Sequence, residues 1–319
     1  MKAWAIDGDV LSSLSRAGGW VNSPPLSAAG LRDKTVLVQF WTYTCINWLR
    51  TLPYIRGWAG KYKDLVVVGV HSPEFEFETD PANVRRAVSE MRIAYPVAFD
   101  PDHAIWKGFG NEYWPALYLL DGNGRIRYQH FGEGKYDEVE QAIQILLAVS
   151  DRSPALVEAR GPELAADWVD LQSGENYLGY LRTEGFASPG GLVKDRSHAY
   201  APPSALRLNQ WALEGNWTMG QRALVAEKPG GLLSYQFHAR DLHLVAGPGR
   251  QGAPVRFRVR IDGKPPGQAH GDDSDAAGNG IVTTPRLYQL IRQSSPIISR
   301  RFDIAFLDPG AEAFVFTFG

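Results

Sequence analysis

Cysteine is nearly absent from this chain, which has one, Cys45, among 319 residues. A single sulfur cannot form a disulfide within the chain, which excludes a disulfide-stabilised fold and an internal dithiol pair. Any thiol chemistry of the sequence must therefore run through Cys45. So few cysteines fit a reducing cytoplasm, and they fit equally a periplasmic protein whose export signal has been removed, so composition leaves both compartments open.

The sequence also lacks an excess of one charge and any long hydrophobic run. Its net charge is -2 with acidic and basic residues interspersed, so it has neither a basic patch for nucleic acid nor a polybasic segment for anionic membranes. The longest apolar runs, near residues 65–70 and 143–149, are far shorter than the roughly 20 residues of a membrane span. Residues 1–7 contain no apolar leader segment. We therefore expect a soluble chain without a nucleic-acid partner or a membrane span, cytoplasmic as given.

What the first half does contain is an alternation of strands and helices. Residues 35–41 and 65–70 have the composition of buried strands, and a helix of about four turns is predicted between them, from Cys45 to near Gly60. Asp80 and Pro81 are typical of a helix start. The later elements are predicted to be a short strand, a hairpin and a closing helix, at residues 96–99, 114–131 and 137–149. The order βαβ then ββα predicts an α/β thioredoxin fold with an inserted helix.

The second half has a different pattern. After residue 150 the periodicity is lost, and beyond about residue 170 short alternating runs are separated by Gly and Pro. In residues 255–261 the apolar side chains alternate with three arginines, as in a strand with one buried face. Strands without interleaved helices predict an all-β antiparallel sandwich or jelly roll. We expect a first domain at residues 1–150, a linker at 151–170 and the sandwich at 171–319.

Cys45 lies where the first predicted strand turns into a helix. The positive end of the helix dipole and the unpaired amides of the first turn both favour the thiolate. This placement predicts a reactive nucleophile. Trp48 stands three residues further on, so the alternative is that Cys45 is a small, inert core residue beneath the bulk of the indole.

Residues 36–47, 49–54, 69–75 and 113–116 resemble the thioredoxin-like domain of the DipZ and TlpA type. The resemblance covers about residues 20–150. Residues 271–273, 278–280, 286–290 and 314–319 look like the C-terminal domain of DipZ-like proteins, which is a carbohydrate-binding-module-like sandwich.

The resemblance implies a thiol-disulfide oxidoreductase domain fused to a β-sandwich. Dithiol members of the family have a cysteine at the position of Trp48, so only the nucleophile position is carried over to this chain. The resemblance also implies that Pro115 follows a cis peptide bond and that Trp114 and Pro115 face Cys45. A strand-entry proline is the alternative interpretation of Pro115.

Three further residues are candidates for proton transfer or substrate binding. Glu74 follows the second strand where TlpA-type domains place an acid near the cysteine pair, and His71 stands three residues earlier. The alternative for each is that it is a solvated loop residue with no part in catalysis. Thr42 precedes Cys45 by three residues, as in the Thr-x-x-Cys of peroxiredoxins, although Val38 stands where those enzymes have proline. The predicted catalytic residues are Cys45, Glu74 and Thr42, and the predicted substrate-binding residues are Trp41, Trp48, Trp114, Pro115 and His71.

The second half offers no convincing metal or cofactor site. Residues 273–279 begin like a calcium loop, but Ala277 and Thr284 stand where oxygen ligands are needed, so a hairpin loop is the better interpretation. His238 and His243 are spaced so that a strand would send them to opposite faces. Two tryptophans, Trp211 and Trp217, are interpreted as core residues rather than sugar-stacking platforms.

Two functions follow from these observations. The first is a single-cysteine thioredoxin-like thiol oxidoreductase, in which Cys45 attacks a disulfide or a peroxide and an external thiol, glutathione or a protein thiol, resolves the product. The alternative is a redox-inactive thioredoxin scaffold whose β-sandwich binds a glycan or a protein. We expect the first, with no cofactor and no metal.

Overall fold

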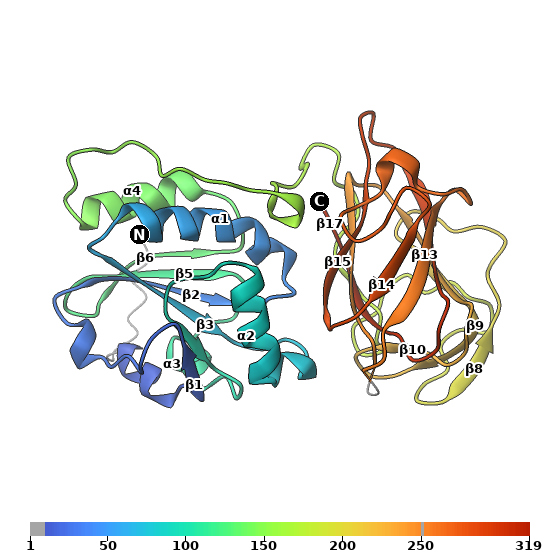
Figure 1. The fold of residues 1–319 in the computed structure, drawn as a ribbon, viewed down its shortest axis with the longest axis horizontal. Helices are drawn as coiled ribbons and strands as arrows, with labels where there is room; N and C mark the ends of the chain where they lie inside the picture. The colour runs from blue at the N-terminus through green and yellow to red at the C-terminus, as the bar shows by residue number, and fades with distance from the viewer. Residues whose placement is uncertain (1–9, 250–251) are drawn as a thin grey trace. The chain divides into compact units, whose positions relative to one another are not determined.

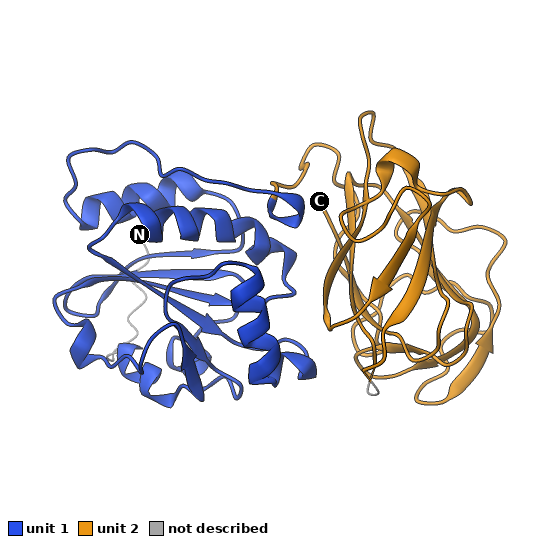
Figure 2. Ribbon diagram, in the orientation of Figure 1, with its two compact units in different colours: residues 1–163 blue, residues 164–319 orange. Residues whose placement is uncertain are grey.

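The computed structural model describes residues 10–249 and 252–319. The first residues of the chain, where no apolar leader is found in the sequence, lie outside this range. The chain divides into two compact units, residues 1–163 and residues 164–319 (Figure 2). No helix among the described residues is both long and apolar enough to cross a bilayer.

The first unit is built on a six-stranded mixed sheet with the order β1-β4-β3-β2-β5-β6 (Figure 1). Parallel pairing joins β2 to β3 and β3 to β4, and the other neighbours are antiparallel. The strands are β1 (Gly19–Val21), β2 (Thr35–Trp41), β3 (Leu65–His71), β4 (Val97–Phe99), β5 (Ala116–Leu120) and β6 (Ile126–Phe131). This is the predicted thioredoxin fold, with β1 as an additional edge strand that the sequence analysis missed.

Helices cover both faces of this sheet. The α-helices are α1 (Ile46–Lys61), α2 (Pro81–Glu90), α3 (Ala104–Gly108) and α4 (Tyr136–Leu146), and the 3-10 helices of this unit are η1 (Val10–Arg16), η2 (Ala29–Leu31), η3 (Glu76–Thr79) and η4 (Gly161–Glu163). On one face α1 and α4 lie side by side (Figure 1), joined by a 2.6 Å hydrogen bond from the Tyr62 hydroxyl to Glu140. On the other face, residues of η1 and α3 pack with Val36, Val38 and Phe40 of β2.

The local signals of the sequence explain these elements. Strand β2 is apolar on both faces because helices cover both, and all but its first residue are buried. Asp80 accepts a 2.8 Å hydrogen bond from the amide of Ala82, and Pro81 occupies the first position of α2, which confirms the predicted helix start.

Residues 151–163 run back along the first unit. The backbone of this segment, which we call the strap, accepts a hydrogen bond from Lys61, and the amide of Ala155 donates to Glu140 at 2.7 Å. Arg56 forms a 2.6 Å ion pair with Glu163 at the end of the strap. Gly57 lets the strap approach α1 closely, because a Cβ at this position would lie 2.7 Å from the carbonyl oxygen of Leu156. The first part of the predicted linker is therefore attached to the first unit.

The described strands of the second unit form an antiparallel sheet of 11 strands that folds over itself into a sandwich. They are β7 (Asn176–Tyr177), β8 (Ser197–Tyr200), β9 (Trp211–Met219), β10 (Leu224–Ala226), β11 (Gly231–Phe237), β12 (Asp241–Gly247), β13 (Val255–Ile261), β14 (Asn279–Val282), β15 (Arg286–Arg292), β16 (Arg300–Phe306) and β17 (Glu312–Phe318), with a 3-10 helix η5 (Gly267–Ala269). Strand β9 belongs to both layers: its first half pairs with β11 and its second half with β10 and β8. Gly215, with φ of 90°, lies between the two halves.

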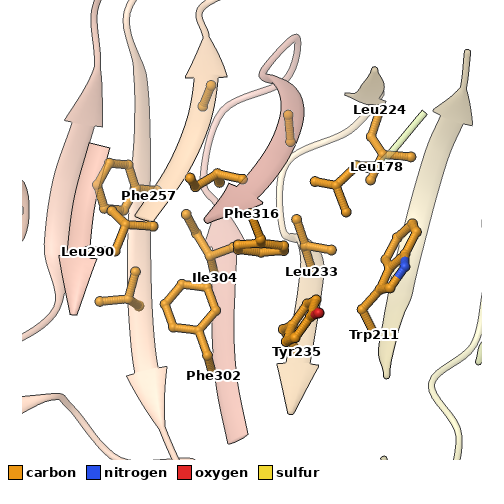
Figure 3. Close-up of a cluster of buried hydrophobic side chains, with 14 of the residues drawn as sticks. Leu178, Trp211, Leu224, Leu233, Tyr235, Phe257, Leu290, Phe302, Ile304 and Phe316 are labelled. Carbon is orange, nitrogen blue, oxygen red and sulfur yellow. The ribbon is translucent and has the colours of Figure 1, made fainter. Parts of the chain in front are cut away.

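The core of this unit fills the space between the two layers (Figure 3). In β13 the side chains of Phe257 and Val259 are buried while the intervening arginines are exposed, as the alternation predicts. Trp211 and Trp217 are fully buried, which confirms their interpretation as core residues. The predicted fold class, a thioredoxin fold followed by an all-β antiparallel sandwich, is confirmed.

Candidate functional site

Cys45 is the N-cap residue of α1 and is half-buried. It sits at the end of a tight turn that follows β2, because its amide donates to the carbonyl of Thr42 at 3.3 Å. Its own carbonyl accepts the amide of Leu49 at 3.0 Å, the first hydrogen bond of the helix. The sulfur is thus held beside the amide end of a 16-residue helix, where the helix dipole favours a negative charge.

The loop before β5 faces this sulfur. The bond between Trp114 and Pro115 is cis, as expected, and the carbonyl oxygen of Trp114 lies 3.9 Å from Sγ of Cys45. Two hydrogen bonds fix the loop: the Trp114 indole donates to the carbonyl of Ser72 at 3.1 Å, and the amide of Gly132 donates to the carbonyl of Pro115 at 2.8 Å. Cys45 and the cis-proline loop therefore lie together, as the family resemblance implies.

Trp48 fills the space on the inner side of α1. Its side chain is fully buried and stacks on Trp41, with ring centroids 4.2 Å apart. Its indole nitrogen donates a 2.9 Å hydrogen bond to Oε1 of Gln39. Since both rings are buried in the core, neither Trp41 nor Trp48 presents a surface to a substrate, although both were predicted to bind one.

The buried acid beside the cysteine loop is Glu78, which the sequence analysis did not select. Its Oε1 accepts the Thr44 hydroxyl at 2.6 Å, and its Oε2 accepts the amides of Glu74 and Phe75 at 2.7 and 3.0 Å. Burial raises the pKa of the Glu78 carboxyl, against the hydrogen bonds that favour its charged form. Thr44 is the residue before Cys45, so this carboxyl supports the turn that carries the sulfur.

Glu74, the acid that was predicted to act near Cys45, is half-buried and contacts Glu78 through its backbone amide. Glu78 lies in the short helix η3 before the Asp80 cap, where its carboxylate accepts the amide of Phe75 in a capping box. No pattern in the neighbouring sequence indicates that the Glu78 side chain is buried beside the turn that carries Cys45.

His71 and Thr42 are both buried. His71 ends β3, and its ring packs edge-on against Trp41 and stacks on Tyr43. Burial lowers the pKa of His71 to about 3, so its ring is neutral at physiological pH. Among the described residues no hydrogen-bond partner is found for Nε2 of His71. Neither side chain reaches the surface at which a substrate would meet Cys45.

The second unit has a polar hollow of about 720 Å³ near β7. Its lining includes Tyr177, Glu184, Asn209, Gln210 and Tyr235, and the Tyr235 hydroxyl accepts a 3.2 Å hydrogen bond from the side-chain amide of Asn176. Asp273, from the loop that begins like a calcium site, instead pairs with Arg286 at 2.6 Å. Within the described residues, no three His, Cys, Asp or Glu side chains are grouped so that they could hold a metal ion.

Comparison with known proteins gives matches to both units. A protein-family model described as "Thioredoxin like C-terminal domain" matches residues 173–319. The protein DipZ of Mycobacterium tuberculosis is 34% identical over 255 residues, which cover 77% of this chain and 36% of DipZ. The chain thus spans about a third of the length of the DipZ proteins that it matches.

The first unit has shorter relatives. The thiol-disulfide oxidoreductase YkuV of Bacillus subtilis is 30% identical over 142 residues, covering 44% of this chain and 96% of YkuV. A thioredoxin-like protein solved in solution in its oxidized form is 31% identical, covers 41% of this chain and 89% of its own, and superposes with a TM-score of 0.39.

Proposed function

The chain belongs to the thioredoxin-like proteins of the DipZ and TlpA type, and from this premise we propose that it is a single-cysteine thiol oxidoreductase with Cys45 as its nucleophile. The observation that carries the proposal is the position of the sulfur: half-buried, at the amide end of α1, and 3.9 Å from the Trp114 carbonyl of the cis-proline loop. Partial exposure and a place beside the helix amides are what a reactive thiolate requires, whereas an inert core cysteine requires neither.

The reaction proceeds through thiol-disulfide exchange. The Cys45 thiolate attacks one sulfur of a substrate disulfide, a bond forms between the two sulfurs, and the second substrate sulfur leaves as a thiolate that takes a proton from solvent. An external thiol then attacks Sγ of Cys45 and releases the substrate as a thiol. A second external thiol restores the Cys45 thiolate, so two thiols are oxidised for each disulfide reduced.

The external thiol is required because the chain has no second cysteine and Trp48 occupies the position three residues on. We propose glutathione or a protein thiol for this role. A peroxide is the less favoured substrate, since the Thr42 hydroxyl is buried rather than exposed beside the sulfur. Glu78 acts as a positioning residue, because its hydrogen bond with Thr44 holds the turn that ends at Cys45.

The proposal is tested by the reactivity of the folded protein. Iodoacetamide should alkylate Cys45 in the native state, and the protein should catalyse glutathione-dependent reduction of bis(2-hydroxyethyl) disulfide, with no turnover when glutathione is omitted. The Cys45→Ser variant should lack both activities while keeping its thermal unfolding curve. A native protein that resists alkylation until it is unfolded in urea would instead support the redox-inactive scaffold.

We propose as a second function that the sandwich binds a glycan in its 720 Å³ hollow, because the lining residues offer hydrogen-bond donors and acceptors together with an aromatic ring. Trp211 and Trp217 take no part, since both are buried in the core. Titration calorimetry with a panel of soluble saccharides tests this idea, with Gln210→Ala as the variant that should weaken binding. Equal binding by the variant would mean that the saccharide binds outside this hollow, and no binding by the unaltered protein would favour a protein ligand instead.

A further inference from the structure

An exposed aromatic pair flanks the cis-proline loop. Tyr113 and Phe131 are 51% and 39% exposed, and their ring centroids lie 5.0 Å apart. Phe131 is anchored from below, because its ring also packs edge-on against the buried Tyr118. Two large neighbouring rings that stay in contact with water leave apolar area unburied, which is typical of a surface that another molecule covers.

The pair is tied to the same loop that faces the sulfur. Tyr113 directly precedes Trp114, whose carbonyl oxygen lies 3.9 Å from Sγ of Cys45. Phe131 ends β6 and directly precedes Gly132, whose amide donates to the carbonyl of Pro115 at 2.8 Å. Each ring therefore belongs to a residue next to one that contacts the cysteine or the cis-proline, and β6 is the edge strand of the sheet (Figure 1).

The surroundings suit a polypeptide better than a small charged thiol. No described residue accepts a hydrogen bond from the Trp114 amide, which leaves a backbone donor available to an incoming peptide carbonyl. On the far side of Trp114 its indole packs against Trp106, with centroids 4.3 Å apart, so that the loop has aromatic groups on both sides. The Arg50 guanidinium, a possible partner for a carboxylate, already pairs with Glu133 at 2.9 Å.

We propose that the Tyr113–Phe131 pair determines substrate specificity by binding an apolar side chain that flanks the reacting cysteine of an extended polypeptide disulfide. This inference rests on the proposed chemistry of Cys45. In the step concerned, the Cys45 thiolate bonds to the peptide sulfur, and the other sulfur of the disulfide departs with the bonding electron pair. The aromatic pair takes no part in the electron transfer and acts by holding the peptide in place.

The test uses two synthetic decapeptides that each carry one cysteine as a mixed disulfide with 5-thio-2-nitrobenzoate. One has leucine and phenylalanine beside the cysteine, and the other has serine and glycine. Stopped-flow absorbance follows the release of the nitrobenzoate thiolate on attack by Cys45. The small disulfide 5,5'-dithiobis(2-nitrobenzoate) reports the reactivity of Cys45 itself.

We expect the apolar peptide to react about tenfold faster than the polar one, a difference of roughly 1.4 kcal/mol. The Tyr113→Ser/Phe131→Ser double variant should lose this preference and keep its rate with the small disulfide within about twofold. Ile145→Ser, which changes a side chain of α4 that is 64% exposed, is the matched control and should keep the preference. Equal rates for the two peptides, or a preference that survives in the double variant, would overturn the inference. Failure of Cys45 to react with the small disulfide would overturn the proposed function instead.

Discussion

Trp48 donates a buried hydrogen bond to Gln39, with 2.9 Å between the indole nitrogen and Oε1. Gln39 in turn donates to the hydroxyl of Tyr95, so the residue at the second-cysteine position belongs to a polar chain that crosses the core of the first unit. The Trp48 indole therefore contributes to the packing and hydrogen bonding of the core. We therefore expect a cysteine at position 48 to lower the stability of the folded protein.

Trp48→Cys should lower the free energy of unfolding by about 3 to 5 kcal/mol, because it leaves a large cavity beside Trp41 and removes the donor to Gln39. Urea denaturation under reducing conditions measures the change. Trp168→Cys is the matched control, since that tryptophan is 63% exposed and its loss should cost less than about 0.5 kcal/mol. A small effect at position 48 would contradict the packing described for the indole.

The same variant tests the geometry of the helix start. On mild oxidation its thiols at positions 45 and 48 should pair, and the protein should gain the ability to reduce insulin with dithiothreitol as electron donor. Mass spectrometry after alkylation distinguishes the paired from the unpaired form. Persistence of two free thiols would count against the thioredoxin fold around α1.

His71 should make the protein less stable in acid. Its pKa is about 3 in the folded state and 6.5 in its ordinary range, so between these values the unfolded chain binds more protons and stability falls as the pH is lowered. The contribution is about 1.4 kcal/mol for each pH unit within that window. His71→Phe keeps the aromatic packing and should show a flatter loss of stability from pH 6.5 downward. Parallel curves for the two proteins would mean that His71 accepts a proton in the folded state.

Glu78 should have the opposite dependence. Burial raises its folded-state pKa above the ordinary 4.5, so the folded protein holds the proton longer and this group's contribution to stability declines as the pH rises through that range. Glu78→Gln replaces one carboxyl oxygen by an NH2 group, which cannot accept the hydrogen bond from the Thr44 hydroxyl while the remaining oxygen accepts the two backbone amides, so the variant should be less stable by about 1 to 3 kcal/mol at pH 4. The difference in unfolding free energy between the unaltered protein and Glu78→Gln should become smaller as the pH rises. A gap independent of pH would show that Glu78 has the same protonation behaviour in both states.

Arg50 and Glu133 form a buried ion pair, with side chains 2% and 8% exposed. Arg50→Met should destabilise the protein by about 3 to 5 kcal/mol, because the Glu133 carboxylate is left buried without its cation. Adding Glu133→Gln to that variant should recover part of the loss. Chemical denaturation of the two single variants and the double variant gives the coupling energy, and a value near zero would show that the pair contributes nothing to folding.

Much of the fold follows from local sequence. Residues 35–41 were predicted as a strand with the bounds that β2 has, because a strand covered on both faces is apolar throughout. The start of α2 at Asp80 and Pro81 could also be predicted, since a capping side chain and a first-turn proline depend only on neighbouring residues. Strand β1 was missed because Gly19–Val21 has three half-buried residues and no alternation.

The candidate site was predictable only in part. Cys45 could be located because it stands where a strong strand signal turns into a helix, and the cis-proline loop because residues 113–116 resemble those of the family. Glu78 could not, since its burial depends on η3 folding back over the cysteine turn and on the distant hydroxyl of Thr44. The burial of His71 likewise depends on contacts with Trp41 and Tyr43 that no local pattern encodes.

The strap determines how short the first unit can be made. Truncation after residue 150 would remove the Ala155 amide from Glu140, the Ser153 carbonyl from Lys61 and the Glu163 carboxylate from Arg56, and would bare one side of α1 to solvent. We therefore expect a fragment that carries the cysteine to be more stable when it ends at or after Glu163, and proteases should cleave within the strap only after it has detached from α1.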